Sequence, residues 1–395
     1  FPQVSETFIV NNLVYAKQKG FDIKIYVNRY LGLKNSSQVS LLKENEIEQD
    51  ILKPFQFSAN KYVKLLQLVE VLANVKVLKF YKYYFLKRGI KWARLSYFYQ
   101  YRFLSKNELV HVHFNNKVEP LVYLHSINYL NQKVIVTFHG YDAFLENKET
   151  FKDKYGEFYK KHVVAVTVNS NYLQDQVVKL GIEMSKIHVV PIGIDTIFFK
   201  NKPKQLNSNE IKILSVGRLI QWKGHVYGLK ATKRLIDKGY NIFYTVIGAG
   251  KLEKELKAEA LKLNIIHFVN FTGAQPQREV RNEMTLNDIF LLPSTFDDIM
   301  KRRETFGLAS VEAQAMGLPV VGFRSGGFPD TIIEGETGFA VEDRNVEQLA
   351  AKIEYLISHP NIYSDMSKAA IKHAQKFDHC KTTQQYLDLY QKFNA

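Results

Sequence analysis

Short apolar runs, each followed by a polar turn, recur along most of the chain. In the first half they span residues 109–114, 133–138, 163–168 and 187–190, and in the second half 211–216, 242–247, 266–271, 288–292 and 319–323. Uninterrupted runs of this length are typical of strands buried on both faces of a parallel sheet. Helical patterns separate the second set, at about 224–238, 251–263, 277–285 and 307–316. Because strands that alternate with helices predict right-handed crossovers, we expect an α/β chain with two doubly wound parallel sheets.

The two ends of the chain follow other patterns. Residues 1–7 indicate a loop that leads into a helix, so we expect a first strand upstream of Phe1. Residues 21–27 alternate like a strand, and a helical region of mixed polarity runs from about 44 to 105. The chain closes with three helical patterns, at about 345–358, 361–376 and 380–393.

A polar stretch at 200–210, with Pro203 and a cluster of asparagine and serine, predicts an interdomain linker. The 395 residues also exceed the ~250–300 at which a single hydrophobic core stops growing. We therefore predict a first domain at 1–199 and a second domain at 200–377. A C-terminal helix at about 378–395 is expected to pack back on the first domain.

Composition bears on the compartment and the partners. The single cysteine, Cys380, cannot form an internal disulfide, and no cysteine–histidine spacing typical of zinc is present. We find no run of about 18 apolar residues and no signal-peptide pattern. The formal charge of +15 favours anionic partners. We expect a cytoplasmic protein, peripheral at the inner face of the plasma membrane.

Much of the positive charge lies between Val71 and Asn107, a stretch without any acidic residue in which lysines and arginines alternate with aromatic residues. Such a segment suits the interface of an anionic membrane, and we favour that partner. It also fits a pair of helices that packs its aromatic rings on the first domain, or an RNA surface that stacks bases. No nucleic-acid partner is expected.

The clearest chemical motif runs from Glu304 to Ala313 and leads from a predicted strand into a helix. Gly307 allows the backbone to approach a ligand closely, and the free N–H groups of a first helical turn favour an anion such as pyrophosphate. Glu304 and Glu312 could then accept hydroxyl groups, one from a transferred sugar and one from a ribose. Alone, the motif equally fits a helix with an acidic start and a solvated Glu312.

Other candidate motifs are incomplete. The glycines of Gly248-Ala249-Gly250 lack the third glycine of a dinucleotide-binding loop, and no Walker A sequence is present. His111 and His113 share a strand face, but a third metal ligand is missing, as it is for Asp297 and Asp298. We expect no metal site.

With these motifs, the chain resembles the family 4 glycosyltransferases, whose hallmark is two glutamates separated by seven residues in a Glu-x-Phe/Pro-Gly context. Further matching segments follow in the family's order: His113-Phe114, Thr137 to Asp142, Val190 to Asp195, Val216-Gly217-Arg218, Trp222-Lys223-Gly224, Gly248-Ala249-Gly250, Phe271-Thr272-Gly273, Pro293-Ser294 and Gly326 to Asp330. The opening Phe1-Pro2 to Phe8 looks like members that build bacterial exopolysaccharide or lipid-linked repeat units.

The resemblance implies a GT-B fold, in which two Rossmann-like domains face a central cleft, and a retaining, metal-independent transfer of a sugar. The substrates are a nucleotide-diphosphate sugar, with UDP favoured over GDP, and a glycan or lipid-linked acceptor; no cofactor is expected. Catalytic roles are implied for four residues: His139, Arg218, Lys223 and Glu304. The implied donor-binding residues are Gly217, Arg218, Lys223, Gly248, Gly273, Glu304, Phe306, Gly307, Leu308 and Glu312.

In this family, the matching arginine and lysine hold the donor diphosphate, where other glycosyltransferases use a divalent cation. The departing phosphate oxygen is thought to deprotonate the acceptor, so no protein nucleophile is assigned. Nucleotide-sugar epimerases and phosphorylases share the architecture and remain alternatives. A nonenzymatic membrane or RNA-binding protein would explain the charge but not the two glutamates.

Overall fold

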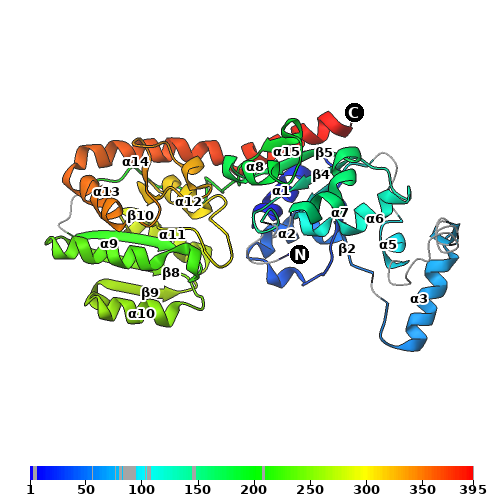
Figure 1. Ribbon diagram of the computed structural model, residues 1–395, viewed down its shortest axis with the longest axis horizontal. Coiled ribbons are helices and arrows are strands. Elements are labelled where there is room, and N and C mark those ends of the chain that lie inside the picture. Colours follow the sequence, from blue (N-terminus) through cyan, green and yellow to red (C-terminus); the bar gives the residue numbers. More distant parts are fainter. Residues whose placement is uncertain are drawn as a thin grey trace.

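The computed structural model of the protein describes residues 1–2, 7–55, 57–75, 77–79, 82, 95–102, 104, 108–144, 148–206 and 210–394. Two α/β halves lie side by side along the long axis of the molecule (Figure 1). Each half is built on a sheet whose recorded strand pairs are all parallel. This confirms the α/β fold class with two parallel-sheet domains. The exact boundaries at 199/200 and 377/378 stay predictions.

The first half begins with a helix, as expected. Its elements are α1 (Thr7–Gln18), β1 (Ile25–Tyr26), α2 (Val39–Glu44), β2 (Ile51–Leu52), α3 (Lys61–Ala73), α5 (Leu95–Gln100), β3 (Val110–His113), α6 (Glu119–Ser126), β4 (Val134–Thr137), α7 (Lys148–Lys161), β5 (Val163–Val168), α8 (Asn171–Val178) and β6 (Ile187–Val189). The strands β3-β4-β5-β6 form one sheet in that order, and β1 pairs with β2 as a separate parallel ribbon.

Side chains of the first sheet alternate between two cores. Val134 and Val136 of β4 point into the large core that also holds α6, α7 and α8 residues. Ile135, between them, joins a smaller cluster with Leu389 of the last helix, α15 (His379–Asn394). The chain end therefore covers a face of the first sheet, and Figure 1 shows α15 crossing to the first half.

The second half has the regular alternation that its sequence predicts. Its elements are β7 (Glu210–Val216), α9 (His225–Asp237), β8 (Asn241–Ile247), α10 (Glu253–Lys262), β9 (Val269–Gly273), α11 (Gln277–Leu286), β10 (Ile289–Leu292), α12 (Leu308–Ala315), β11 (Val320–Phe323), β12 (Gly338–Val341), α13 (Val346–Ser358) and α14 (Pro360–Ala374). The strand order is β12-β11-β10-β7-β8-β9.

Helices cover both faces of this second sheet. Ile213 of β7 belongs to a core with α9 and α13 residues, whereas the next residue, Leu214, belongs to a core with α11 and α12 residues. Burial on both faces explains why the strands appear in the sequence as continuous apolar runs.

Three expectations for the elements were wrong. The region 44–105 is not helical throughout, since it contains the strand β2. Residues 266–268 form a 3-10 turn, so that β9 starts only at Val269. The strand β12 was not predicted, because its Gly338-Phe339-Ala340-Val341 is short and half of it is glycine and alanine.

About half of the basic aromatic stretch 71–107 lies outside the described residues. Within it, Phe98, Tyr99 and Tyr101 are described and buried in the first core, which fits the interpretation that these rings pack on the first domain. None of the helices in the described part of the chain is long and apolar enough to span a membrane.

Candidate active site

The strand order of the second sheet reverses between β7 and β10. β7 is the first strand of this half, and its neighbours β8 and β10 lie on opposite sides of it. Ligands of open α/β sheets bind beyond the carboxyl ends of the strands at such a point. Gly217 and Arg218 follow β7, and the segment that leads to Glu304 follows β10. The fold thus brings together two predicted site segments that are far apart in sequence.

Lys223 and Glu304 form an ion pair at this point through Nζ and Oε2. Their side chains are only 18% and 14% exposed. The flanking residues hold Lys223 in place. Gly224, which follows it, adopts a left-handed φ of 64°, and its missing Cβ would lie 1.8 Å from the carbonyl oxygen of Pro293. Thr295 N–H also donates to the carbonyl of Trp222 at 2.8 Å. A cation and a carboxylate are therefore fixed together beyond β7 and β10.

Three predicted glycines, Gly217, Gly248 and Gly273, lie at the carboxyl ends of the neighbouring strands β7, β8 and β9. Gly217 N–H donates to Ile247 O, and Gly248 N–H donates to Gly273 O, both at 2.9 Å. A Cβ on Gly248 would come within 1.9 Å of the carbonyl oxygen of Gly217. Only glycine therefore fits at position 248. The backbone of Gly217 lies next to the side chain of Lys223, because a Cβ added to Gly217 would be 3.5 Å from Lys223 Cδ.

Arg218 occupies a more exposed position than Lys223. Its guanidinium lies over the ring of Trp222, 5.5 Å from the centroid. The convergence of Arg218 and Lys223 on one anion stays a prediction, because Lys223 is paired with Glu304.

The start of α12 has the geometry that its sequence indicates. Gly307 has φ 96° and directly precedes Leu308, the half-buried first residue of the helix. Phe306 is only 2% exposed and packs edge-on against Phe377 at 5.8 Å, so its side chain belongs to the core and only its backbone can face a donor. Glu312 lies one turn further along; burial raises the pKa of its carboxyl to about 8, against a smaller lowering by a hydrogen bond from Gln277.

His139 stands at the carboxyl edge of the first sheet, two residues after β4. Asp142 accepts its backbone N–H at 3.0 Å, and Thr305 Oγ1 donates to its carbonyl at 3.2 Å. The rings of Phe8 and Phe114 lie 5.0 and 4.4 Å from the imidazole. Burial and nearby His113 hold the pKa of His139 well below its usual range. The imidazole is therefore neutral and next to the Glu304–Thr305 turn.

A set of polar contacts joins the two halves beside this histidine. Ser170 Oγ donates to Thr305 O at 2.6 Å. Asn171, the first residue of α8, donates to Asp330 from its backbone N–H and from its side-chain amide. A Cβ on Gly140 would lie 2.8 Å from Thr305 Cγ2. The two halves thus lie directly against each other beside His139 and Thr305.

The loop before Glu304 is folded on itself. Asp297 is buried and accepts the backbone N–H groups of Ile299 and Met300. Asp298 pairs with Arg344 at 2.6 Å. Neither carboxylate reaches another acidic residue in the recorded contacts of this loop.

The structure adds a third imidazole to the predicted pair, since His139 lies next to His113. Nevertheless, the nitrogens of His111, His113 and His139 are not among the groups of three ligand atoms within 4.8 Å of one another. In the described part of the chain, one such group occurs, at Asp378-His379-Cys380. Both oxygens of Asp378 already accept hydrogen bonds, from Thr196 and from the Cys380 backbone.

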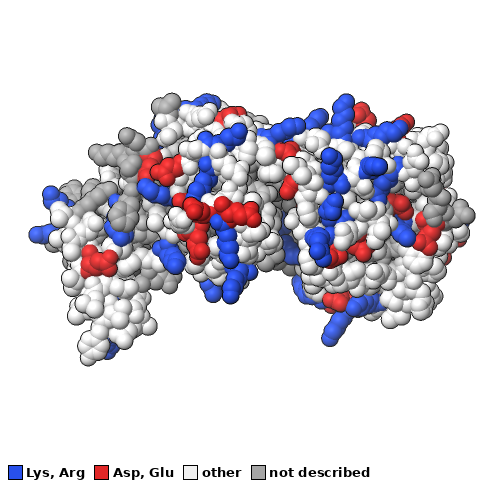
Figure 2. Space-filling view, turned by 180° about the vertical axis from the view of Figure 1, so that it is seen from behind, with Lys and Arg blue, Asp and Glu red and all other residues white. Residues whose placement is uncertain are grey.

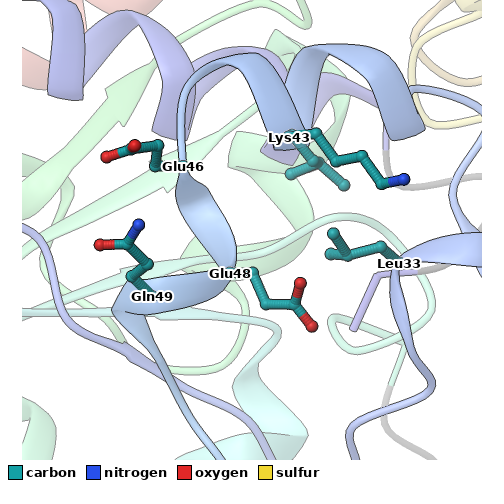
Figure 3. A pocket seen from close by; sticks show the side chains of 6 residues that line it. Leu33, Lys43, Glu46, Glu48 and Gln49 are labelled. Carbon is teal, nitrogen blue, oxygen red and sulfur yellow. The ribbon is translucent and has the colours of Figure 1, made fainter.

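A hollow of about 380 Å³ lies elsewhere in the first half, between α2 and the turn that precedes β2 (Figure 3). It is lined by Leu33, Leu42, Lys43, Glu46, Glu48 and Gln49. It contains none of the predicted site residues, so we do not assign the site to it.

Sequence reasoning missed three residues at the site: Ser170, Asn171 and Gln277. Ser170 and Asn171 follow β5 directly, so the rule that ligands bind at the carboxyl ends of strands could have identified them. Gln277 begins α11, 35 positions before Glu312, and no sequence pattern links the two.

Two family comparisons together cover most of the chain. Residues 6–198 match the family described as Glycosyltransferase Family 4, and residues 197–373 match Glycosyl transferases group 1. The chain is 27% identical over 367 residues to the amylovoran biosynthesis glycosyltransferase AmsK of Erwinia amylovora, covering 89% of this chain and 87% of that protein. It is 26% identical to WcaL of Salmonella typhimurium, named for colanic acid biosynthesis, over 68% of this chain and 66% of that one.

Solved structures show the same fold over nearly the whole chain. A glycosyltransferase from Rickettsia africae superposes with a TM-score of 0.70 at 21% identity, covering 98% of this chain and 94% of the other. Anabaena Alr3699/HepE in complex with UDP gives 0.71 at 18% identity, with coverages of 99% and 97%. By these matches and by the order of its motifs, the chain belongs to the family 4 glycosyltransferases, with a group 1 glycosyl transferase domain as its second half.

Proposed function

We propose that the protein transfers a sugar from a nucleotide-diphosphate sugar, UDP favoured over GDP, to a glycan or lipid-linked acceptor in cell-surface polysaccharide biosynthesis. The observation that carries this proposal is the Lys223–Glu304 pair, held at the switch point of the second sheet beside the start of α12. The UDP complex of Anabaena Alr3699/HepE supports the choice of nucleotide. The names of the amylovoran and colanic acid relatives support the pathway class.

Each site residue has a role that follows from its chemistry. The cations of Arg218 and Lys223 and the first N–H groups of α12 suit the diphosphate, whose charge grows as the sugar leaves. Glu304 accepts hydroxyl groups of the sugar, and Glu312, with Gln277, those of the ribose. Since Lys223 and Glu304 are paired, the donor must either enter between the two side chains or bind to both while they stay paired.

The mechanism we propose retains the configuration of the anomeric carbon and needs no metal ion. Lys223 and Arg218 supply the positive charge that a divalent cation supplies in other glycosyltransferases. The departing phosphate oxygen takes the proton of the acceptor hydroxyl, so that Glu304 orients the sugar instead of attacking it. Turnover that persists in EDTA and an α-linked product from an α-linked donor are the expected results.

A panel of donors tests the proposal directly. Purified protein is incubated with UDP- and GDP-sugars, with and without a lipid-linked saccharide fraction, and the products are separated. Acceptor-dependent release of UDP supports transfer, whereas an isomerised sugar nucleotide would indicate an epimerase, and phosphate-dependent release of a sugar phosphate a phosphorylase. Failure of any nucleoside diphosphate to raise the melting temperature would support a nonenzymatic protein instead.

We further propose that the protein works at the inner face of the plasma membrane, where a lipid-linked acceptor lies. The helix α3 supports this, because it stands off the first half in Figure 1 and exposes Tyr62, Leu65, Leu66 and Val69 by 83, 59, 71 and 59%. Its projection is mostly free of charge in Figure 2, where basic side chains are spread over both halves. These apolar side chains precede the basic residues of 71–107 in the sequence, a combination that suits an anionic lipid surface.

Vesicle flotation separates this proposal from simple charge attraction. We expect binding to vesicles with anionic lipid, weaker at high salt, and further reduced when Tyr62, Leu66 and Val69 are changed together to Ser. The control is Leu261→Ser with Leu286→Ser, two apolar residues of the second half that are 59% and 64% exposed. An equal loss of vesicle binding in both variants would contradict a membrane surface at α3, as would a failure of the unaltered chain to bind.

A further inference from the structure

His113 and His139 share a hydrogen bond at the carboxyl edge of the first sheet. His113 is the last residue of β3, which pairs with β4 so that His113 lies opposite Thr137. His113 Nδ1 and His139 Nε2 are 3.1 Å apart, and the two ring planes are inclined by only 21°.

One proton lies between these two nitrogens, because a hydrogen bond joins one donor to one acceptor. Both rings are neutral near pH 7, since burial lowers the pKa of His113 to about 4 and that of His139 well below its usual range. If His113 Nδ1–H donates, the single proton of His139 is on Nδ1. If His139 Nε2–H donates, Nδ1 of His139 carries no proton. The tautomers of the two rings are therefore coupled.

His139 Nδ1 is buried and has no hydrogen-bond partner among the described residues. The ring is confined by Phe8 and Phe114, and its backbone is fixed by Asp142 and Thr305. Most buried polar atoms in folded proteins are paired, so an unpaired nitrogen at the edge where α/β proteins bind ligands points to a group of the substrate as its partner.

We propose that His113 is a positioning residue that keeps the shared proton on its own Nδ1, so that His139 presents an Nδ1–H donor to an oxygen of the bound nucleotide sugar. This inference rests on the proposed function for the identity of the ligand. Phosphate oxygens only accept hydrogen bonds, and a bare imidazole lone pair facing one would be repelled. Of the two coupled arrangements, only the one in which His113 donates suits a diphosphate.

The neighbouring His111 cannot take this role. Its Nδ1 contacts Tyr390 Oη at 2.5 Å and its Nε2 contacts Thr137 Oγ1 at 2.6 Å, so both nitrogens are engaged within the first half. His113 is the one of the two that reaches His139.

Nitrogen NMR of the full chain with ¹⁵N-labelled histidine reads the tautomer directly, without any need for catalysis. We expect His139 to carry its proton on Nδ1 in the free chain and in complexes with UDP and UDP-glucose. In His113→Phe, which keeps a ring but has no donor, the proton of His139 should move to Nε2. His113→Asn places an amide N–H close to the position of the lost Nδ1–H and should restore the Nδ1 tautomer.

Kinetics supply the second readout. His113→Phe should lower kcat by roughly 10- to 100-fold, the effect that loss of an orienting partner of a histidine has at metal sites, while KM stays nearly constant. His113→Asn should recover most of the lost rate. His188→Phe, in β6 of the same sheet beside Lys392, serves as the control that leaves the rate unchanged.

The inference is overturned if His139 of the unaltered chain carries its proton on Nε2, or if His113→Phe leaves the tautomer as it was. The tautomer in the free chain decides this even if no nucleotide binds. Absence of nucleotide binding would instead count against the proposed function, so the two failures are distinguishable.

Discussion

Asp330 accepts two hydrogen bonds from Asn171, one from the backbone N–H at 2.6 Å and one from the side-chain amide at 3.2 Å. The two residues belong to different halves, and Asp330 lies at the start of α8, where the helix dipole favours a carboxylate. Next to this contact, Ser170 Oγ donates to Thr305 O. The two halves are therefore held in contact by polar groups beside the site.

Replacing Asp330 by Ala should weaken the contact between the two halves. Hydrogen bonds to a charged group contribute about 1.5–3 kcal/mol, and partial exposure reduces this figure, so we expect the population in which the halves are in contact to fall several-fold. Small-angle scattering should show a larger radius of gyration, and KM for the donor should rise. The control is Asp365→Ala, an acidic residue of α14 paired only within its helix in the recorded contacts; an equal expansion in both variants would contradict the role of the Asp330 contact.

Lys223→Ala should lower kcat by about 10²–10³-fold, the usual effect of removing one group that stabilises charge in a transition state. Glu304→Gln keeps the shape of the side chain but not its charge, and should lower turnover to a comparable degree. Circular dichroism should show both variants folded. Near-normal turnover by either one would remove the pair from the proposed machinery. Lys251→Ala, which removes an exposed lysine of the same half, should have little effect.

Glu312 should make the stability of the free protein fall with rising pH. Its pKa is raised from 4.5 to about 8 on folding, so the folded state binds more protons than the unfolded state between these values, and unfolding becomes easier as pH rises. We expect Glu312→Gln to melt above the unaltered protein at pH 8.5, with a difference that shrinks toward pH 5. A difference that is constant or grows toward low pH would contradict the raised pKa.

Gly224→Ala should destabilise the second half and abolish stabilisation by UDP. Gly224 combines a left-handed φ of 64° with a Cβ position 1.8 Å from Pro293 O. Gly335 also has a left-handed φ, of 78°, but nothing lies within 4 Å of its Cβ position. Thermal melts of Gly224→Ala and Gly335→Ala therefore separate the steric clash of a new Cβ from the strain of a left-handed backbone. A similar fall in melting temperature in both variants would contradict the packing of the 217–224 segment against β10.

The fold was predictable where burial on both faces leaves a continuous apolar run. Such runs located β5 and β10 within one or two residues, and helical periodicity located α9 and α13 as well. β2 and β12 were missed because a strand of two to four residues has too few positions to show a period.

The site was predictable as a set of segments but not as a set of contacts. The family's motif order pointed to Lys223 and Glu304 separately, yet their ion pair joins positions 81 residues apart and depends on the neighbouring strands β7 and β10. Phe306 lies within the motif, but its side chain faces the core, because the alternation of buried and open positions around Gly307 depends on how α12 packs. The coupling of His113 to His139 likewise needed the register of β3 on β4.

The return of α15 to the first half means that the polypeptide passes between the halves twice, close to Ile194 and again close to Asp378. The two passages are hydrogen-bonded to each other, since Ile194 N–H donates to Phe377 O at 2.8 Å and His379 N–H donates to Ile194 O at 2.9 Å. A protease that cuts either passage alone should therefore leave one particle in which both halves remain joined.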